Sequence, residues 1–348
     1  MSIEFLYNFD DIRQLIENIL CKNGTPDDIS STVSESLLQA EGKGVLSHGI
    51  MRLPSYINLI KEGTIDNKAR PEFHQEGASA VTVDGKFGFG MLIGLETSKM
   101  ASKISSNTGI CLAVGKNINH LGMLEYFTEL AAKEGHIIIA MTNAHPTVAY
   151  PGRKEPTIGT NPICISIPSE KGTFNFDMAI SKSSFGMIRE AALEGKKIPE
   201  DIAIDREGNV TNDPISALAG SLLPMGGIKG YALGMVVDML AGILSNSAVG
   251  KEVLTWNDEG KRWNSGLVII SIDPSFFISR EFFEMRVEQY LENTRFYSTD
   301  HRVPGDRRQR NLADSRENGL RIKEKTVDIL KVLAKKYGLE FPKSQVRQ

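Results

Sequence analysis

The fold class is decided by four short runs of sequence: AVTVDG at 80–85, GICLAVG at 109–115, HIIIAMTN at 136–143 and PICISIP at 162–168. Each run is rich in β-branched or apolar residues and is bounded by Gly, Pro or Asn, which is typical of a β-strand. A further run, GLVIISID at 266–273, has the same character. The middle of the chain therefore predicts a sheet.

Helical segments surround these strands. Their apolar residues recur with a spacing near 3.6, which is typical of an amphipathic helix. Asp10 is expected to cap the first helix, and Thr25 with Pro26 at the first helical position begins the second. The expected helices are two within 10–42, and then 94–107, 123–134, 227–244, 280–293 and 323–337. Strands and helices together predict an α/β protein.

A dinucleotide-binding fingerprint is missing. Gly85, Gly88 and Gly90 in DGKFGFG do not have the GxGxxG spacing, and we expect them to open no helix with an acid about twenty residues on. The sequence therefore argues against a Rossmann fold. It also lacks GxxxxGK[ST], HExxH and GxSxG.

Composition narrows the class of partner. The 348 residues carry 40 Lys and Arg against 43 Asp and Glu, a net charge of -3 that argues against nucleic acid or an acidic membrane as the main partner. No segment predicts a signal peptide or a membrane span. Three widely spaced cysteines without a CxxC pair argue against a disulfide framework and a zinc site. We expect a cytoplasmic protein with a small-molecule ligand and no metal.

A dense polar group follows the second expected helix. His48 titrates in the range useful for moving a proton to or from a substrate oxygen. Arg52 can bind a carboxylate in bidentate fashion, and Ser47 can orient the imidazole. A surface helix start with an exposed ion pair explains the same pattern, so the spacing alone leaves both interpretations open.

Two further groups stand where strands end, a common place for sites. His120 follows one strand, and Thr160 with Asn161 lies in a turn before another. The side chains of this turn can donate to a carbonyl or carboxamide. The alternatives are that His120 only caps a helix or satisfies a buried carbonyl, and that Thr160 and Asn161 only form a tight turn.

Two segments suit an anion. Gly226 and Gly227 precede Lys229 at a helix start, where exposed N–H groups, the helix dipole and the charge attract a phosphate. HRVPGDRRQR at 301–310 can clamp a pyrophosphate. A solvated lysine and a solvated basic loop explain these segments equally well.

Four stretches together carry a resemblance: SHGIMRLPSYI at 47–57, IGTNPICISIP at 158–168, FDMAIS at 176–181 and IKGYALGMVVDMLAGILS at 228–245. In this order they resemble the malate/L-lactate dehydrogenase family that is unrelated to Rossmann-type enzymes and includes ureidoglycolate dehydrogenase, sulfolactate dehydrogenase and 2,3-diketogulonate reductase. The resemblance implies a mostly antiparallel sheet domain, 76–279, that binds the nicotinamide cofactor. A helical lobe, 1–75, packs with a C-terminal segment, 280–348, usually in a homodimer.

The resemblance also implies roles for individual residues. His48 is the proton donor or acceptor, Ser47 its partner, and His120 a second site histidine. Some members place an acid after the FDMATS-like strand, whereas here Gly186 is followed by Met187, so Asp177 is the nearest candidate. Arg52, Thr160 and Asn161 are expected to contact the substrate. The cofactor-contacting residues are expected to be Thr173, Phe174, Asn175, Phe176, Asp177, Met178, Ala179, Ile228, Lys229, Gly305, Asp306 and Arg307.

The resulting hypothesis is an oxidoreductase that uses NAD, with NADP as the alternative, to move hydride to or from the alpha carbon of a small 2-hydroxy or 2-oxo acid. A cyclic imine 2-carboxylate reductase is the alternative within the same chemistry. A non-catalytic binding protein and a metal hydrolase are the alternatives outside it. The six histidines show no HxH or HExxH spacing, which argues against the hydrolase.

Overall fold

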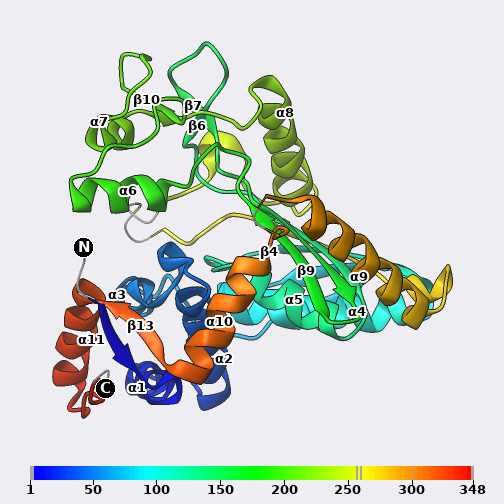
Figure 1. Ribbon diagram of the computed structural model, residues 1–348, viewed down its shortest axis with the longest axis horizontal. Helices are drawn as coiled ribbons and strands as arrows, with labels where there is room; N and C mark the ends of the chain where they lie inside the picture. Colours follow the sequence, from blue (N-terminus) through cyan, green and yellow to red (C-terminus); the bar gives the residue numbers. More distant parts are fainter. Residues whose placement is uncertain (1–3, 256–257, 259–260, 300, 346–348) are drawn as a thin grey trace.

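The computed structural model describes residues 4–255, 258, 261–299 and 301–345. Within these ranges the strands form sheets of seven, four and two strands, and each sheet is the centre of one part of the molecule (Figure 1). The two ends of the described chain both lie in the part built on the two-stranded sheet.

The seven-stranded sheet has the order β2-β3-β4-β12-β5-β8-β9. Neighbouring strands are antiparallel except β3 and β4, which are parallel. The predicted mostly antiparallel sheet is therefore confirmed. The strands are β2 (Glu72–Gln75), β3 (Ala80–Asp84), β4 (Ile110–Lys116), β5 (Ile137–Thr142), β8 (Ile163–Ser169), β9 (Gly172–Met178) and β12 (Leu267–Ile272).

Helices pack on this sheet, and the π-helical turn η3 (Asp238–Ile243) contacts β5 and β12 as well. Helix α4 (Gly90–Thr108) contacts β4 and β12, α5 (Glu125–Lys133) contacts β5, β8 and β9, and α9 (Arg280–Tyr297) contacts β8. Helix α4 begins at Gly90 rather than at residue 94, so DGKFGFG leads into a helix, but as expected no acid follows about twenty residues on. A Cβ on Gly90 would clash with the carbonyl oxygen of Asn119, so glycine permits this close approach.

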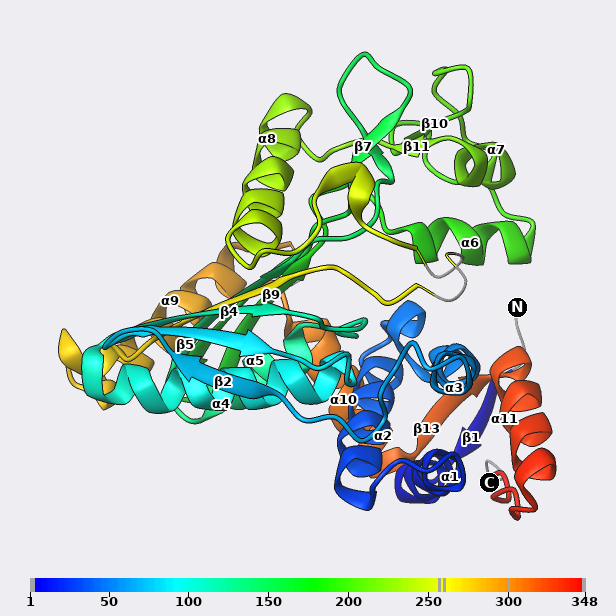
Figure 2. The same ribbon diagram turned by 180° about the vertical axis from the view of Figure 1, so that it is seen from behind.

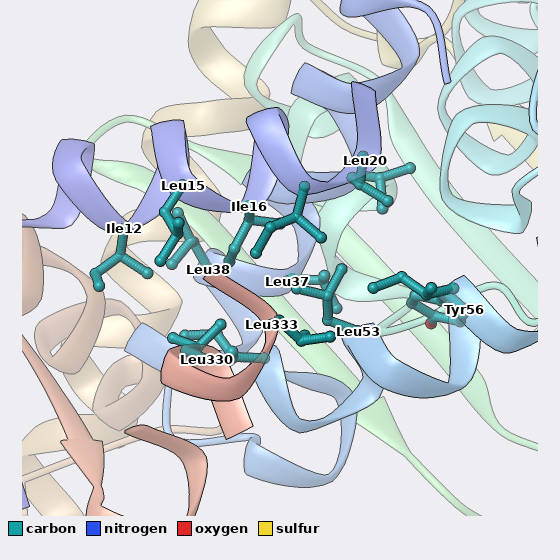
Figure 3. Close-up of a cluster of buried hydrophobic side chains, with 14 of the residues drawn as sticks. Ile12, Leu15, Ile16, Leu20, Leu37, Leu38, Leu53, Tyr56, Leu330 and Leu333 are labelled. Carbon is teal, nitrogen blue, oxygen red and sulfur yellow. The ribbon is translucent and has the colours of Figure 1, made fainter. Parts of the chain in front are cut away.

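The helical lobe joins the two ends of the chain. It contains α1 (Phe9–Lys22), α2 (Asp27–Gly42), α3 (Leu53–Lys61), α10 (Asp306–Asn318) and α11 (Glu324–Tyr337), with β1 (Glu4–Tyr7) paired to β13 (Leu320–Lys323). Figure 3 shows its apolar core, where Ile12, Leu37, Leu53 and Leu330 meet from four helices.

Two local predictions in this lobe, both of helix caps, were wrong. The side chain that caps α1 is Asn8, which accepts from the backbone N–H groups of Asp10 and Asp11. The N-cap of α2 is Pro26, without a side-chain hydrogen bond, so Thr25 is not the cap. The charged stretch 306–325 forms α10, β13 and the start of α11. Leu312 and Leu320 are buried there, which tertiary packing decides rather than local charge.

The third part surrounds the four-stranded sheet, in the order β10-β11-β6-β7. Its helix α6 reaches the helical lobe, where Lys323 pairs with Glu190 and Glu194. Two short 3-10 turns, η4 (Gly250–Glu252) and η5 (Pro274–Phe276), follow later in the chain. The elements of this part are β6 (Val148–Ala149), β7 (Pro156–Ile158), α6 (Phe185–Glu194), β10 (Ala203–Ile204), α7 (Pro214–Ala219), β11 (Ser221–Leu222) and α8 (Ile228–Val237), which continues as the π-helical turn η3 (Asp238–Ile243).

Within the predicted C-terminal segment, α10 and α11 pack in the helical lobe whereas α9 packs on the large sheet (Figure 2). In the described part of the chain, no helix combines the length and apolar character that crossing a membrane requires.

Candidate active site

Ser47, His48 and Arg52 lie on two consecutive 3-10 turns between α2 and α3, η1 (Leu46–His48) and η2 (Ile50–Arg52). The Oγ of Ser47 lies 2.9 Å from Nδ1 of His48. Nε of Arg52 donates to the carbonyl oxygen of Ser47 at 2.6 Å. The tight turns thus bring together the three side chains that the sequence singled out.

The buried carboxyl group of Glu41, on α2, binds the backbone of the second turn, η2. The backbone N–H of Ile50 donates to Oε2 of Glu41 at 3.0 Å. A Cβ on Gly49 would clash with the same oxygen, so a larger residue there would displace the Glu41 carboxyl group. Burial raises the pKa of Glu41 to about 7. Sequence analysis missed Glu41, because one acid at the end of a helix carries no signal.

His120 faces His48 across the site. The two imidazole rings stack with centroids 5.5 Å apart and planes at 19°. Oη of Tyr56 lies 2.9 Å from Nδ1 of His120, and the ring of Trp263 meets His120 edge-on at 6.3 Å. Tyr56 stands within the quoted SHGIMRLPSYI motif, so that motif could have suggested it. No sequence signal distinguishes Trp263.

Both histidines are neutral at pH 7. Burial lowers the pKa of His48 to about 3, and the charges of Arg52 and Arg308 act in the same direction. Burial also holds the pKa of His120 well below its ordinary value, with Arg52 and His48 adding to the effect. A buried imidazole beside guanidinium groups disfavours its charged form for both reasons.

The two histidines line a cavity of about 100 Å³. Thr160, expected to contact the substrate, is among the lining residues. Asn161 is not, because it is fully buried behind the wall. Its Oδ1 accepts from the N–H of Ala144 at 3.0 Å, and its Nδ2 donates to the carbonyl of Gly234 at 2.9 Å. The predicted contact of Asn161 with substrate is therefore corrected to a supporting role. The remaining lining residues are Ile118, Asn119, Leu121, Gly122, Thr142, Asn143, Ala144, Pro162, Trp263, Ser265 and Gly266.

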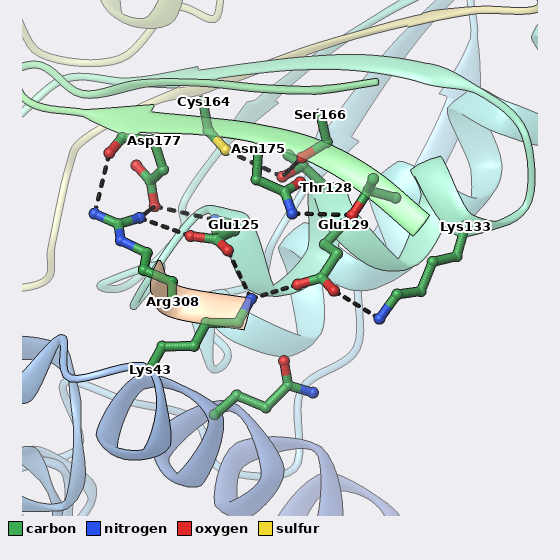
Figure 4. A network of polar contacts seen from close by, with 12 residues as sticks. Lys43, Glu125, Thr128, Glu129, Lys133, Cys164, Ser166, Asn175, Asp177 and Arg308 are labelled. Atoms are coloured by element: carbon green, nitrogen blue, oxygen red, sulfur yellow. Dashed lines mark hydrogen bonds and ion pairs between the residues drawn. The ribbon is translucent and has the colours of Figure 1, made fainter. Parts of the chain in front are cut away.

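Asp177 belongs to a different group of charges, shown in Figure 4. It accepts from the backbone N–H of Glu125 at 3.2 Å and pairs with Arg308 at 3.7 Å. Burial raises its pKa to about 6, while the charge of Arg308 opposes that shift. Among the described residues it bonds to neither histidine, so the proposed acid relay is corrected: Arg308 holds this carboxylate elsewhere.

The predicted cofactor strand is divided between its two faces. Thr173, Asn175 and Asp177 share one face because side chains alternate along a strand, and this face is the one covered by α5 and α10. Phe174, Phe176 and Met178 lie on the opposite face. A ligand on one face of β9 reaches only one of these sets directly.

The other predicted cofactor segments lie at helix starts. Gly227, at φ +64°, is the N-cap of α8, and Ile228 and Lys229 form its first turn. Gly305, at φ +94°, precedes α10, and a Cβ there would lie 2.8 Å from the carbonyl oxygen of Asn175. Segment 305–307 therefore adjoins β9. Asp306 is engaged within the chain by Arg295, with oxygens 2.9 and 3.0 Å from two guanidinium nitrogens.

The sequence and structure match known proteins over most of the chain. The family model described as malate/L-lactate dehydrogenase matches residues 7–331. This chain belongs to the malate/L-lactate dehydrogenase family. It is 36% identical to the malate/(S)-sulfolactate dehydrogenase of Methanothermus fervidus, over 94% of this chain and 97% of that protein. It is 30% identical to the Delta(1)-pyrroline-2-carboxylate/Delta(1)-piperideine-2-carboxylate reductase of Pseudomonas putida, over 93% and 96%.

A solved structure agrees with the sequence matches. The sulfolactate dehydrogenase of Methanocaldococcus jannaschii superimposes with a TM-score of 0.89 at 33% identity, covering 96% of this chain and 98% of that one. Family membership makes the protein an oxidoreductase of the 2-hydroxy-acid type. A nicotinamide cofactor is typical of such dehydrogenases.

The cavity residues fit a nicotinamide group. Asn119 lines the cavity, and its Nδ2 donates to the carbonyl oxygens of Phe87 and Gly88. Its Oδ1 is buried and has no hydrogen-bond partner in the described part of the chain. A carboxamide N–H₂ is a suitable donor for that oxygen. Within residues 4–255, 258, 261–299 and 301–345, no three His, Cys, Asp or Glu side chains gather as a metal site would require.

Proposed function

We propose that the protein is an NAD(P)-dependent oxidoreductase that moves hydride between the nicotinamide and the alpha carbon of a small 2-hydroxy or 2-oxo acid. The observation that carries the proposal is the position of His48, which lines the cavity while Ser47 holds its Nδ1 and Arg52 stands beside it. NAD is the proposed cofactor, with NADP as the alternative. When bound, the cofactor supplies or accepts the hydride.

His48 carries the proton in this mechanism. Since Nδ1 faces Ser47, Nε2 is the nitrogen available to the substrate oxygen. A neutral imidazole accepts the hydroxyl proton directly when a hydroxy acid is oxidised. In the reverse direction it must first be protonated. His120, whose Nδ1 faces Tyr56, is the second candidate for this role.

Arg52 couples substrate binding to that proton. Its Nε bond to the Ser47 carbonyl fixes the guanidinium beside His48. The positive charge of Arg52 contributes to the low pKa of His48, so a bound substrate carboxylate would offset that charge and raise the pKa. Substrate binding thus makes His48 a better proton carrier. Thr160 contributes a hydroxyl to the same cavity.

The cofactor is proposed to extend from Asn119 along β9 to the two helix starts. The first turns of α8 and α10 present backbone N–H groups suited to phosphate, with Lys229 and Arg307 as nearby charges. The predicted division of the chain into 1–75, 76–279 and 280–348 is also kept as a proposal. A cytoplasmic location is proposed from the three cysteines, which are all free thiols.

We also propose a homodimer. Helix α8, with η3 and the adjoining Leu244, exposes seven large apolar side chains, and large exposed apolar patches on soluble proteins mark interaction sites. Light scattering of the purified protein measures the assembly directly. The exposed residues are Ile228, Leu233, Met235, Val236, Met239, Ile243 and Leu244.

The function is tested by following the absorbance of NADH and NADPH with a panel of 2-oxo acids, for the wild type and His48→Ala. Loss of the proton carrier should lower kcat/KM by about 10²- to 10⁴-fold, while the dissociation constant of the reduced cofactor stays unchanged. His74→Ala, at an exposed histidine, is the matched control and should retain full activity. Activity that survives in His48→Ala would transfer the role to His120.

The relationship to the Pseudomonas putida reductase favours one alternative, reduction of a cyclic imine 2-carboxylate. The same assay distinguishes it, because piperideine-2-carboxylate would then be turned over and 2-oxo acids would not. A protein that binds neither NADH nor NADPH would instead be the non-catalytic binding protein.

A further inference from the structure

The cavity lies at one edge of the seven-stranded sheet, where β4 and β5 end and β8 and β12 begin. A buried carboxyl group stands behind this edge. Asp238 is the first residue of the π-helical turn η3, is only 7% exposed and is not one of the residues that line the cavity. Short π-helical turns within helices often accompany functional sites. The proposed mechanism gives this buried acid no role, so its contacts must explain it.

Two asparagine amides point at Asp238. Nδ2 of Asn143 donates to Oδ1 of Asp238 at 3.1 Å. Burial raises the pKa of Asp238, and the side-chain hydrogen bonds from Asn143 and Asn161 oppose that shift. Because a carboxylate only accepts hydrogen bonds, the N–H₂ end of each amide faces the carboxylate and the oxygen of each amide is left for another donor. Asp238 therefore determines the orientation of both amides.

The two amide oxygens hold the backbone of the cavity wall. Oδ1 of Asn143 accepts from the N–H of Gly266 at 2.9 Å, and Oδ1 of Asn161 accepts from the N–H of Ala144 at 3.0 Å. Asn143, Ala144 and Gly266 all line the cavity. One carboxylate thus controls, through two amides, the contacts that join the end of β5, the turn before β8 and the start of β12.

The wall is held under constraint. Asn161 has a φ of +35°, a conformation that a residue other than glycine keeps only where its surroundings impose it. A Cβ on Gly266 would clash with the carbonyl oxygen of Ala241, so the start of β12 is pressed against η3. A buried polar network whose members are satisfied favours one arrangement of its groups. Loss of the central acceptor would release that arrangement.

We propose that Asp238 is a positioning residue: through the amides of Asn143 and Asn161 it holds the cavity wall in the geometry that hydride transfer beside His48 requires. The inference rests on the proposed function and deepens it, because it gives a role to an acid that lies outside the cavity. A shift of about 1 Å in the groups that position a substrate can lower the rate about 10²-fold.

The test is Asp238→Asn, which keeps the size of the side chain but replaces one acceptor oxygen with a donor. With sites counted by titration with NADH, kcat per site should fall about 10- to 100-fold, while the Kd of NADH changes by less than about threefold. A residue that only stabilises the fold would lower the free energy of unfolding and leave kcat per site intact. The matched control is Asp273→Asn, at the opposite end of β12, which should keep full kcat.

A second measurement follows the wall directly and needs no turnover. The chain has two tryptophans, so in a Trp256→Phe background the emission comes from Trp263, which lines the cavity beside Gly266. Asp238→Asn should raise the constant for acrylamide quenching at least about twofold, because a loosened wall opens more often to solvent. Asp273→Asn should leave the constant unchanged.

Asn161→Ala removes one of the two amides between Asp238 and the wall. It should reproduce the fall in kcat and the rise in quenching in smaller measure, and it replaces Asp238→Asn if that variant does not fold. A normal kcat per site, with any change confined to stability or to the Kd of NADH, or unaltered quenching, would overturn the inference and leave the proposed function standing.

A wild type that reduces neither 2-oxo acids nor cyclic imines would overturn the proposed function instead. The quenching measurement then decides alone whether Asp238 holds the wall: a rise in Asp238→Asn without one in Asp273→Asn supports this, and equal constants in both variants contradict it.

Discussion

Two polar regions of this molecule differ in how their ionisable side chains are paired. In the ionic cluster of Lys43, Glu125, Glu129, Asp177 and Arg308, every charged group has a partner of opposite sign (Figure 4). At the candidate site, His48 and His120 lie partly buried beside Arg52, where desolvation and that charge hold their pKa values below the ordinary one. The paired charges of the cluster join segments of the fold. Titratable groups with a perturbed pKa, such as the two histidines, are typical of sites that transfer a proton.

The ionic cluster joins the helical lobe to the sheet. Lys43 extends from the end of α2 to Glu125 of α5, with Nζ and Oε1 2.7 Å apart. Arg308 of α10 pairs with the other oxygen of Glu125 at 2.6 Å and donates to the carbonyl of Asp177 on β9. Arg308 also lies close enough to His48 to influence its pKa. The cluster therefore holds the helical lobe and the sheet together near the candidate site.

The largest effect is expected from breaking the cluster. Lys43→Met leaves Glu125 and Glu129 buried with less compensation, which should lower the free energy of unfolding by about 3 to 5 kcal/mol. Urea denaturation measures it. Lys99→Met, in an exposed pair with Glu96, is the control and should change stability by less than about 1 kcal/mol. Equal small losses in both variants would show that the cluster does not stabilise the junction.

Glu41 shares a feature with each region: it is a buried carboxyl group, and it accepts a hydrogen bond from Ile50 in the turn that follows His48. Its pKa is raised from 4.5 to about 7, so its folded state holds the proton more tightly than the unfolded chain. The associated stability is present below pH 4.5 and is lost as pH rises through about 7. The Glu41→Gln variant does not have this pH dependence. The free energy of unfolding of the variant minus that of the wild type should therefore rise between pH 5 and pH 8, by on the order of 2 kcal/mol.

Thermal or urea unfolding at both pH values provides this measurement. The same substitution at exposed Glu62 is the control and should show no pH-dependent difference. A stability difference for Glu41→Gln that is constant from pH 5 to pH 8 would mean that Glu41 does not titrate in this range.

The sequence predicted the sheet and most helices because their apolar patterns are local. It also grouped Ser47, His48 and Arg52 correctly, since a short segment cannot separate them widely. It failed where contacts are remote in sequence. Arg308 lies in a charge run whose burial depends on Glu125, 183 residues away. Asn161 was misassigned because its turn was predicted correctly but the helix α8 that binds its amide was not placed.

The smallest effect is expected at Tyr56, and it separates the two histidines. Tyr56→Phe keeps the packing but removes the hydrogen bond to Nδ1 of His120. If His48 is the proton carrier, kcat should fall by only about 2- to 10-fold, in line with the loss of one hydrogen bond worth about 0.5 to 1.5 kcal/mol. Steady-state kinetics with the preferred acid measures this. A fall as large as that of His48→Ala would make His120, oriented by Tyr56, the group that moves the proton.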